Sequence, residues 1–199
     1  MGARMPIVSV EERVAILRQW GISKPVIRLA CGEQVHELLG TAYEGPPWFV
    51  YQEKLFGINP DLPPRIVNRQ AEVFVGPPFV PLWEYDGSVT GVRQMNGRLE
   101  FIGFDLESAD ESWVIARTEQ GFLASIMVNF YEPRTSSNWE SFEDAPEAAA
   151  AIGFRYYDEL SAAMERTTLG LEEFTRWFVG QVDEWCRPAE SGAAAAPTG

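Results

Sequence analysis

Two aspartate–glycine or asparagine–glycine dipeptides divide the middle of this chain into three short, largely apolar segments. Asp86-Gly87 and Asn96-Gly97 separate the segments 79–85, 88–94 and 98–104. Both dipeptides favour the positive backbone angles of type I′ turns, which join neighbouring antiparallel strands. The spacing therefore predicts a three-stranded antiparallel meander in the middle of the chain.

Side-chain alternation predicts what these strands face. In the first strand we expect Trp83 and Tyr85 on one face and Leu82 and Glu84 on the other, because successive strand residues point to opposite sides. The third strand carries apolar residues in both registers, which is typical of a central strand covered by helices. A short apolar segment at 113–116 predicts a fourth strand.

Helical signals precede the meander. The segment 10–20 has helically spaced apolar residues, follows a capping Ser9 and ends at Gly21. A second helix is expected over 24–40, with a break at Gly32.

The segment between these helices and the meander is rich in proline. Residues 43–81 contain three Pro-Pro pairs and one Asn-Pro pair, which exclude a helix. Short strands are expected at 48–51 and 72–75.

Helical signals return after the fourth strand. Thr118 is placed to cap a helix over 119–131. An alanine-rich helix at 145–152 should end at Gly153, and another should cover 156–166. The apolar residues that are expected to line these helices are Phe122, Leu123, Ile126, Met127 and Phe130 in the first, and Leu171, Phe174, Trp177, Phe178, Val182 and Trp185 in the last helix of the chain.

This order of elements is typical of an α+β fold. We expect an antiparallel meander sheet of about four to six strands, with the N- and C-terminal helices packed mainly on one face. Residues 1–187 should form a single domain. Residues 188–199 have the low complexity of a disordered tail.

The charge of the chain is unevenly distributed. The net charge of −13 falls entirely in residues 100–199, because the first 99 residues hold equal numbers of acidic and basic side chains. An acidic field of this kind repels nucleic acid and steers basic proteins toward the surface. We therefore predict a basic protein partner, no nucleic-acid partner, and a chain that is a monomer or a homodimer.

Motifs for catalysis are weak. His36 is the only histidine, and its i, i+5 spacing from Cys31 places the two about 140° apart around a helix. Cys31 and Cys186 indicate no disulfide framework, and no glycine-rich phosphate loop occurs. We predict no catalytic residues and no cofactor, and the absence of a signal peptide or membrane span favours a cytoplasmic protein.

The densest carboxylate group follows the third strand. Asp105 and Glu107 have the alternate spacing that could hold Mg²⁺ or Ca²⁺, but the glycine pattern of an EF-hand is missing. We interpret the group as a solvated acidic loop beside the sheet and predict no metal site. The residues expected to bind a partner are Glu84, Asp86, Asp105, Glu107, Asp110, Glu111 and Trp139.

The segment from Phe79 to Glu132 resembles the SUKH superfamily, the Smi/Knr-like fold. The resemblance lies in the hairpin meander PLWEYDGSVTGVRQMNGRLEFIGFDLE, a strand ending in Ala116, a helix capped by Thr118, and the pair Phe122-Leu123. Bacterial members are commonly immunity proteins that bind and neutralise toxin domains, often nucleases, and other members are interaction scaffolds. The resemblance therefore implies a binding protein and supplies no catalytic motif.

Three functions follow from these observations. The first is a non-catalytic, immunity-type protein that neutralises a basic toxin or effector domain through an acidic surface. The alternative is an α+β domain that binds a small molecule at its aromatic-rich sheet, or hydrolyses one with paired carboxylates. A third is a structural subunit that forms a homodimer through the sheet or the last helix.

Overall fold

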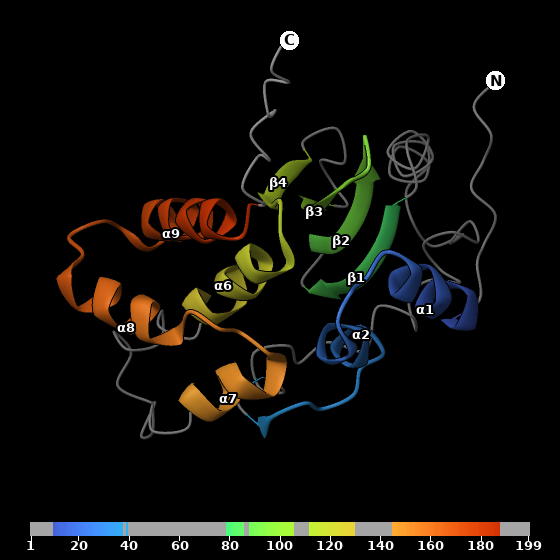
Figure 1. Cartoon of the computed structure of the whole chain (residues 1–199), viewed down its shortest axis with the longest axis horizontal. Helices are drawn as coiled ribbons and strands as arrows, with labels where there is room; N and C mark the ends of the chain where they lie inside the picture. The colour runs from blue at the N-terminus through green and yellow to red at the C-terminus, as the bar shows by residue number, and fades with distance from the viewer. Residues whose placement is uncertain are drawn as a thin grey trace, which may run out of the picture.

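The structure is a computed structural model, and it describes residues 10–37, 39, 79–85, 88–105, 112–129 and 145–187. Within these ranges the chain forms six helices and one four-stranded antiparallel sheet (Figure 1). The α+β class is confirmed. No helix in these ranges combines the length and the apolar character that crossing a membrane requires.

The sheet follows the predicted meander closely. Its strands lie in the order β1-β2-β3-β4, with bounds β1 (Phe79–Tyr85), β2 (Ser88–Met95), β3 (Arg98–Asp105) and β4 (Trp113–Ala116). Asn96 and Gly97 have φ angles of 52° and 76°, which confirms the primed turn between β2 and β3. Asp86 and Gly87, in the other predicted turn, lie outside the described residues.

The alternation predicted for β1 is wrong at Leu82. The β1–β2 register shifts between Pro81 and Trp83, so Leu82 is the extra residue of a β-bulge. Leu82 is fully buried in the core, and Trp83 packs against the same core and stacks on Phe122 with 5.4 Å between ring centroids. The bulge lets two consecutive large side chains reach one core. The side chains of Glu84 and Tyr85 lie outside the described part of the structure, so the faces predicted for them stay predictions.

The helices end where the sequence indicates. Their bounds are α1 (Val10–Gln19), α2 (Lys24–Ala30), α6 (Glu119–Asn129), α7 (Ala145–Ile152), α8 (Tyr157–Arg166) and α9 (Leu171–Trp185). Gly21, Gly32 and Gly153 have φ angles of 78°, 74° and 78°, and this left-handed backbone terminates α1, α2 and α7. The predicted break at Gly32 is confirmed. The predicted cap Ser9 and the proposed strands at 48–51 and 72–75 lie outside the described residues.

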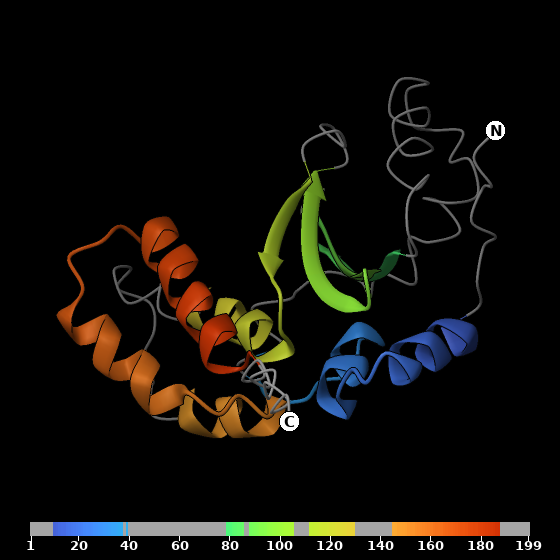
Figure 2. The same ribbon diagram turned by 45° about the horizontal axis from the view of Figure 1, so that its top comes forward.

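Helix α6 is the centre of the fold (Figure 2). It contacts β4 and α9, while α1 and α2 contact β1 at the opposite edge of the sheet. Phe101 of β3 stacks on Phe122 of α6, with 4.3 Å between ring centroids. The sequence predicts one buried stripe on this helix, but every residue from 121 to 128 is buried except Ser125. A helix buried nearly all round belongs to the interior of a domain.

The N-terminus of α6 is anchored to α9. Thr118 Oγ1 accepts a hydrogen bond from the Gly121 N–H at 2.9 Å, which confirms the predicted cap. The Asp183 carboxylate of α9 accepts bonds from the Thr118 hydroxyl at 2.7 Å and from the Arg117 N–H at 2.8 Å. A carboxylate at this position also suits the positive end of the α6 dipole.

The next two residues of α6 hold two further elements. Glu119 accepts a bond from the Ser23 N–H at the start of α2, at 2.9 Å. The Gln120 side chain donates to the Gly153 carbonyl and accepts from the Arg155 N–H, at 2.9 and 3.0 Å. One helical turn thus joins α2, α9 and the α7–α8 connection.

Candidate functional site

The strand register brings two of the predicted partner-binding residues to one end of the sheet. Tyr85, Ser88 and Asp105 lie opposite one another across three strands, and Glu84 lies in the adjacent row. Since β1 and β3 are separated by one strand, the backbones at Glu84 and Asp105 are about 10 Å apart across the sheet. Residues about twenty positions apart in sequence therefore share one edge of the fold.

The remaining predicted partner-binding residues are Asp86, Glu107, Asp110, Glu111 and Trp139, which lie outside the described residues. For the first four of these residues, the topology still fixes where the connection that carries them begins. Asp86 belongs to the connection from β1 to β2, and residues 106–111 to the connection from β3 to β4. Both connections start at the end of the sheet that carries Glu84 and Asp105.

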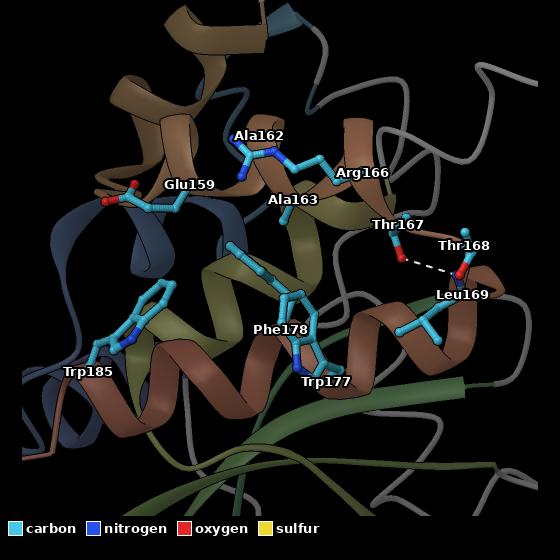
Figure 3. A pocket seen from close by; sticks show the side chains of 10 residues that line it. All are labelled: Glu159, Ala162, Ala163, Arg166, Thr167, Thr168, Leu169, Trp177, Phe178 and Trp185. Carbon is cyan, nitrogen blue, oxygen red and sulfur yellow. Dashed lines mark hydrogen bonds between the residues drawn. The ribbon is translucent and has the colours of Figure 1, made fainter.

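A groove between α8 and α9 is a second candidate site, which was not predicted from the sequence (Figure 3). Its volume is about 520 Å³. Five large apolar side chains are exposed in the described part of the chain, and three of them, Leu169, Trp177 and Trp185, line this groove. Each of the two tryptophans is 47% exposed, so both are available for contact with another molecule.

The floor of the groove is a continuous series of aromatic rings. Phe178 is buried beneath the groove, and its ring centroid lies 6.1 Å from both Trp177 and Trp185. Trp185 also contacts Tyr156, with 5.2 Å between centroids. These contacts hold the two tryptophans against the helix pair while leaving half of each side chain exposed.

The rim of the groove carries charges of both signs. Figure 3 shows Glu159 near Trp185 at one end, and Arg166 rising from the last turn of α8. The small side chains of Ala162 and Ala163 lie between them on α8 and leave the groove open. Spacing of three and four residues places all four on one face of the helix, and this spacing is the signal in the sequence that could have revealed the site.

Tyr156 and Cys186 meet beside the groove. The Tyr156 hydroxyl and the Cys186 thiol are 3.4 Å apart, and either atom can donate the hydrogen bond. The pKa of Tyr156 is raised above its ordinary value, mainly by this hydrogen bond and secondly by desolvation. The two thiols of the chain, Cys31 and Cys186, are both free and partly buried.

A second cavity lies between α1 and α2. It has a volume of about 740 Å³ and is lined by Arg18, Lys24 and Arg28 together with Cys31 and Glu33. Desolvation and then the Glu33 carboxylate raise the pKa of the Cys31 thiol, although Arg18 acts in the opposite direction. A raised pKa leaves less of the reactive thiolate at neutral pH, so Cys31 is poorly suited to nucleophilic chemistry.

Within the described ranges, no group of three or more histidine, cysteine, aspartate or glutamate side chains could hold a metal ion. The aromatic-lined groove lies between two helices and not on the sheet, and the predicted small-molecule site at the sheet stays a prediction. No protein-family model, curated protein or solved structure matches this chain. The resemblance to the SUKH superfamily stays a prediction.

Proposed function

We propose that this chain is a non-catalytic protein-binding domain that captures a basic partner at the acidic end of its sheet. The observation that carries the proposal is the strand register, which brings the backbones of Glu84 and Asp105 to the same end of the sheet, where the connections bearing Asp86 and Glu107 begin. The net charge of −13 adds a long-range field of the same sign. The most specific form of this function is an immunity-type protein that neutralises a basic toxin or effector domain, as the SUKH resemblance implies.

The physical basis of the proposal is electrostatic steering. A surface of one sign raises the association rate of an oppositely charged partner by roughly 10- to 1000-fold, and salt reduces this gain. Exposed charges are screened over about 10 Å at 0.1 M ionic strength, whereas buried apolar contacts are not. The acidic residues should therefore control association, and an aromatic anchor such as Trp139 should control dissociation.

The test begins with capture of a partner from cell extract at low salt, with the tagged chain as bait. A basic protein should be retained by the wild-type chain and lost with the Glu107→Lys/Asp110→Lys variant. The matched control is Glu165→Lys/Glu184→Lys, which changes the net charge equally on exposed residues of α8 and α9.

Binding kinetics with the captured protein then separate the two roles. The association rate should fall steeply as salt rises and should fall more in the Glu107→Lys/Asp110→Lys variant than in the control. Trp139→Ala should act mainly on dissociation. Recovery of no basic partner, or an association rate indifferent to salt, would overturn the proposal in favour of the small-molecule alternative.

A further inference from the structure

The α8–α9 groove is independent of the acidic end of the sheet and has a feature of its own. Three exposed apolar side chains gather in one open groove, whereas exposed apolar residues are ordinarily scattered singly over the surface of a monomer. Tryptophan is also among the residues most enriched at the energetic centres of protein interfaces. The groove therefore has the composition of an interface that lacks its partner.

The charges on the rim identify what the partner must carry. Glu159 and Arg166 are seven residues apart on α8, which places them on the same face and about 10 Å apart along the helix axis. Among the described residues neither side chain makes an ion pair. An occupant of the groove should therefore present a cation opposite Glu159 and an anion opposite Arg166, at the same separation.

A second copy of this chain meets that requirement by symmetry. The midpoint between positions 159 and 166 falls between Ala162 and Ala163, the smallest side chains on this face. Rotation by 180° about an axis through that point sets Glu159 of each copy opposite Arg166 of the other. A two-fold interface is self-complementary in this way, because a contact between two positions is made twice.

We propose that two copies of this chain associate through their α8–α9 grooves, about a two-fold axis that passes between Ala162 and Ala163. The two alanines allow the α8 helices to approach closely in antiparallel orientation. Each copy then covers the exposed Trp177 and Trp185 of the other, and two Glu159–Arg166 pairs fix the register at the rim. The acidic end of the sheet is not part of this interface, so the dimer can form whether or not a basic partner exists.

Charge reversal tests the symmetry directly. Glu159→Arg alone would set arginines opposite one another twice, and Arg166→Glu alone would do the same with glutamates. Each single variant should dimerise roughly 100-fold more weakly than the wild type, because like charges face each other at both ends. An equimolar mixture of the two variants should form a heterodimer, and the double variant Glu159→Arg/Arg166→Glu should dimerise again.

The measurement is sedimentation velocity over a range of protein concentrations, with far-UV circular dichroism as a check that each variant is folded. The matched controls are Glu172→Arg and Arg176→Glu, which alter an exposed ion pair of α9 that does not line the groove, and they should leave the dimer unchanged. A wild-type chain that is monomeric at every concentration would overturn the proposal and leave the groove to a different protein or to a small molecule. A mixture that fails to restore the dimer lost in both single variants would overturn the two-fold arrangement.

Discussion

Helices α6 and α9 pack against each other and are both rich in apolar residues, yet their surroundings differ. α6 is buried nearly all round, and its first turn is hydrogen-bonded to α2, α9 and the α7–α8 connection. α9 buries Phe174, Phe178, Val179 and Val182, while Trp177 and Trp185 remain 47% exposed. Apolar content alone therefore does not separate the residues that fold this chain from those that can hold a partner. What distinguishes the two helices is whether neighbouring elements cover the helix on every side.

The largest effect is expected at Phe122 of α6. Its ring stacks on Phe101 and Trp83 and is 1% exposed, so Phe122→Ala should lower the free energy of unfolding by about 3–5 kcal/mol. Urea unfolding followed by circular dichroism measures this loss, with Trp177→Ala as the comparison on α9. A loss at Phe122 no larger than that at Trp177 would contradict the contrast between the helices.

Replacement of glycine by alanine should lower the stability of the fold at Gly121 and raise it at Gly180. A Cβ at Gly121 of α6 would overlap the Asp183 carboxylate, with 2.9 Å to its Cγ, and would lie 3.3 Å from the Ala116 Cβ. Gly121→Ala should therefore destabilise the fold by about 1–3 kcal/mol. At Gly180 of α9 no atom beyond the adjoining helix backbone lies within 4 Å of a new Cβ among the described residues, so Gly180→Ala should stabilise the helix by about 0.5–1 kcal/mol. Thermal unfolding of the two variants should shift in opposite directions, and two shifts of the same sign would reject this comparison.

The junction between the two helices should contribute a smaller amount. Asp183→Asn keeps the size of the side chain but replaces one of two acceptor oxygens with a donor that faces Thr118 or the Arg117 N–H. The expected loss is about 1–2 kcal/mol. Glu184→Gln changes the next residue, which is exposed, and should have almost no effect in the same urea titration. Equal losses at both positions would mean that Asp183 does not anchor α6.

The smallest effect is a change in the titration of Tyr156 beside the groove. Its pKa is raised mainly by the bond to Cys186, so Cys186→Ala should lower that pKa toward the ordinary tyrosine value of about 10. The folded chain holds this proton more tightly than the unfolded chain. The stabilisation is therefore complete below the ordinary pKa and is lost as the pH rises through the higher folded value. Tyrosinate absorbance, corrected with Tyr156→Phe, measures the shift, and no change in Cys186→Ala would remove the role of the thiol.

Local signals explain why so much of the fold could be predicted. Asn96-Gly97, Thr118 and Gly153 act on their own neighbours in sequence, and each forms the turn, cap or helix end that its residue type favours. The bulge at Leu82 and the burial of α6 on nearly every side depend on packing against other elements, so alternation and helical spacing did not indicate them.

The two candidate sites also differ in how far they could be predicted from the sequence. Clustering of acidic residues can be counted in the sequence, and the meander itself determines that Glu84 and Asp105 reach one end of the sheet. The groove depends on how α8 and α9 pack, and the residue spacing on α8 indicates one face of that helix but not which element packs across from it. Trp177 and Trp185 fit the apolar spacing of a buried stripe, and only the packing of the helices leaves them half exposed.

The central claim is that α6 serves folding, whereas the groove face of α8 and α9 serves association, and unfolding over a range of protein concentrations tests it most directly. A dimer gains stability with concentration by mass action, up to about 1.4 kcal/mol for each tenfold increase. We expect this dependence in the wild type and in Glu159→Arg/Arg166→Glu, whereas either single variant should show it only at roughly 100-fold higher concentrations. The reversals also oppose the α8 dipole, by about 0.3–1 kcal/mol at each end, so the double variant should be the least stable of the four when dilute and still regain the dependence. Phe122→Ala should be destabilised at every concentration. Wild-type unfolding that is independent of concentration, or a double variant that behaves like the single ones, would contradict the account.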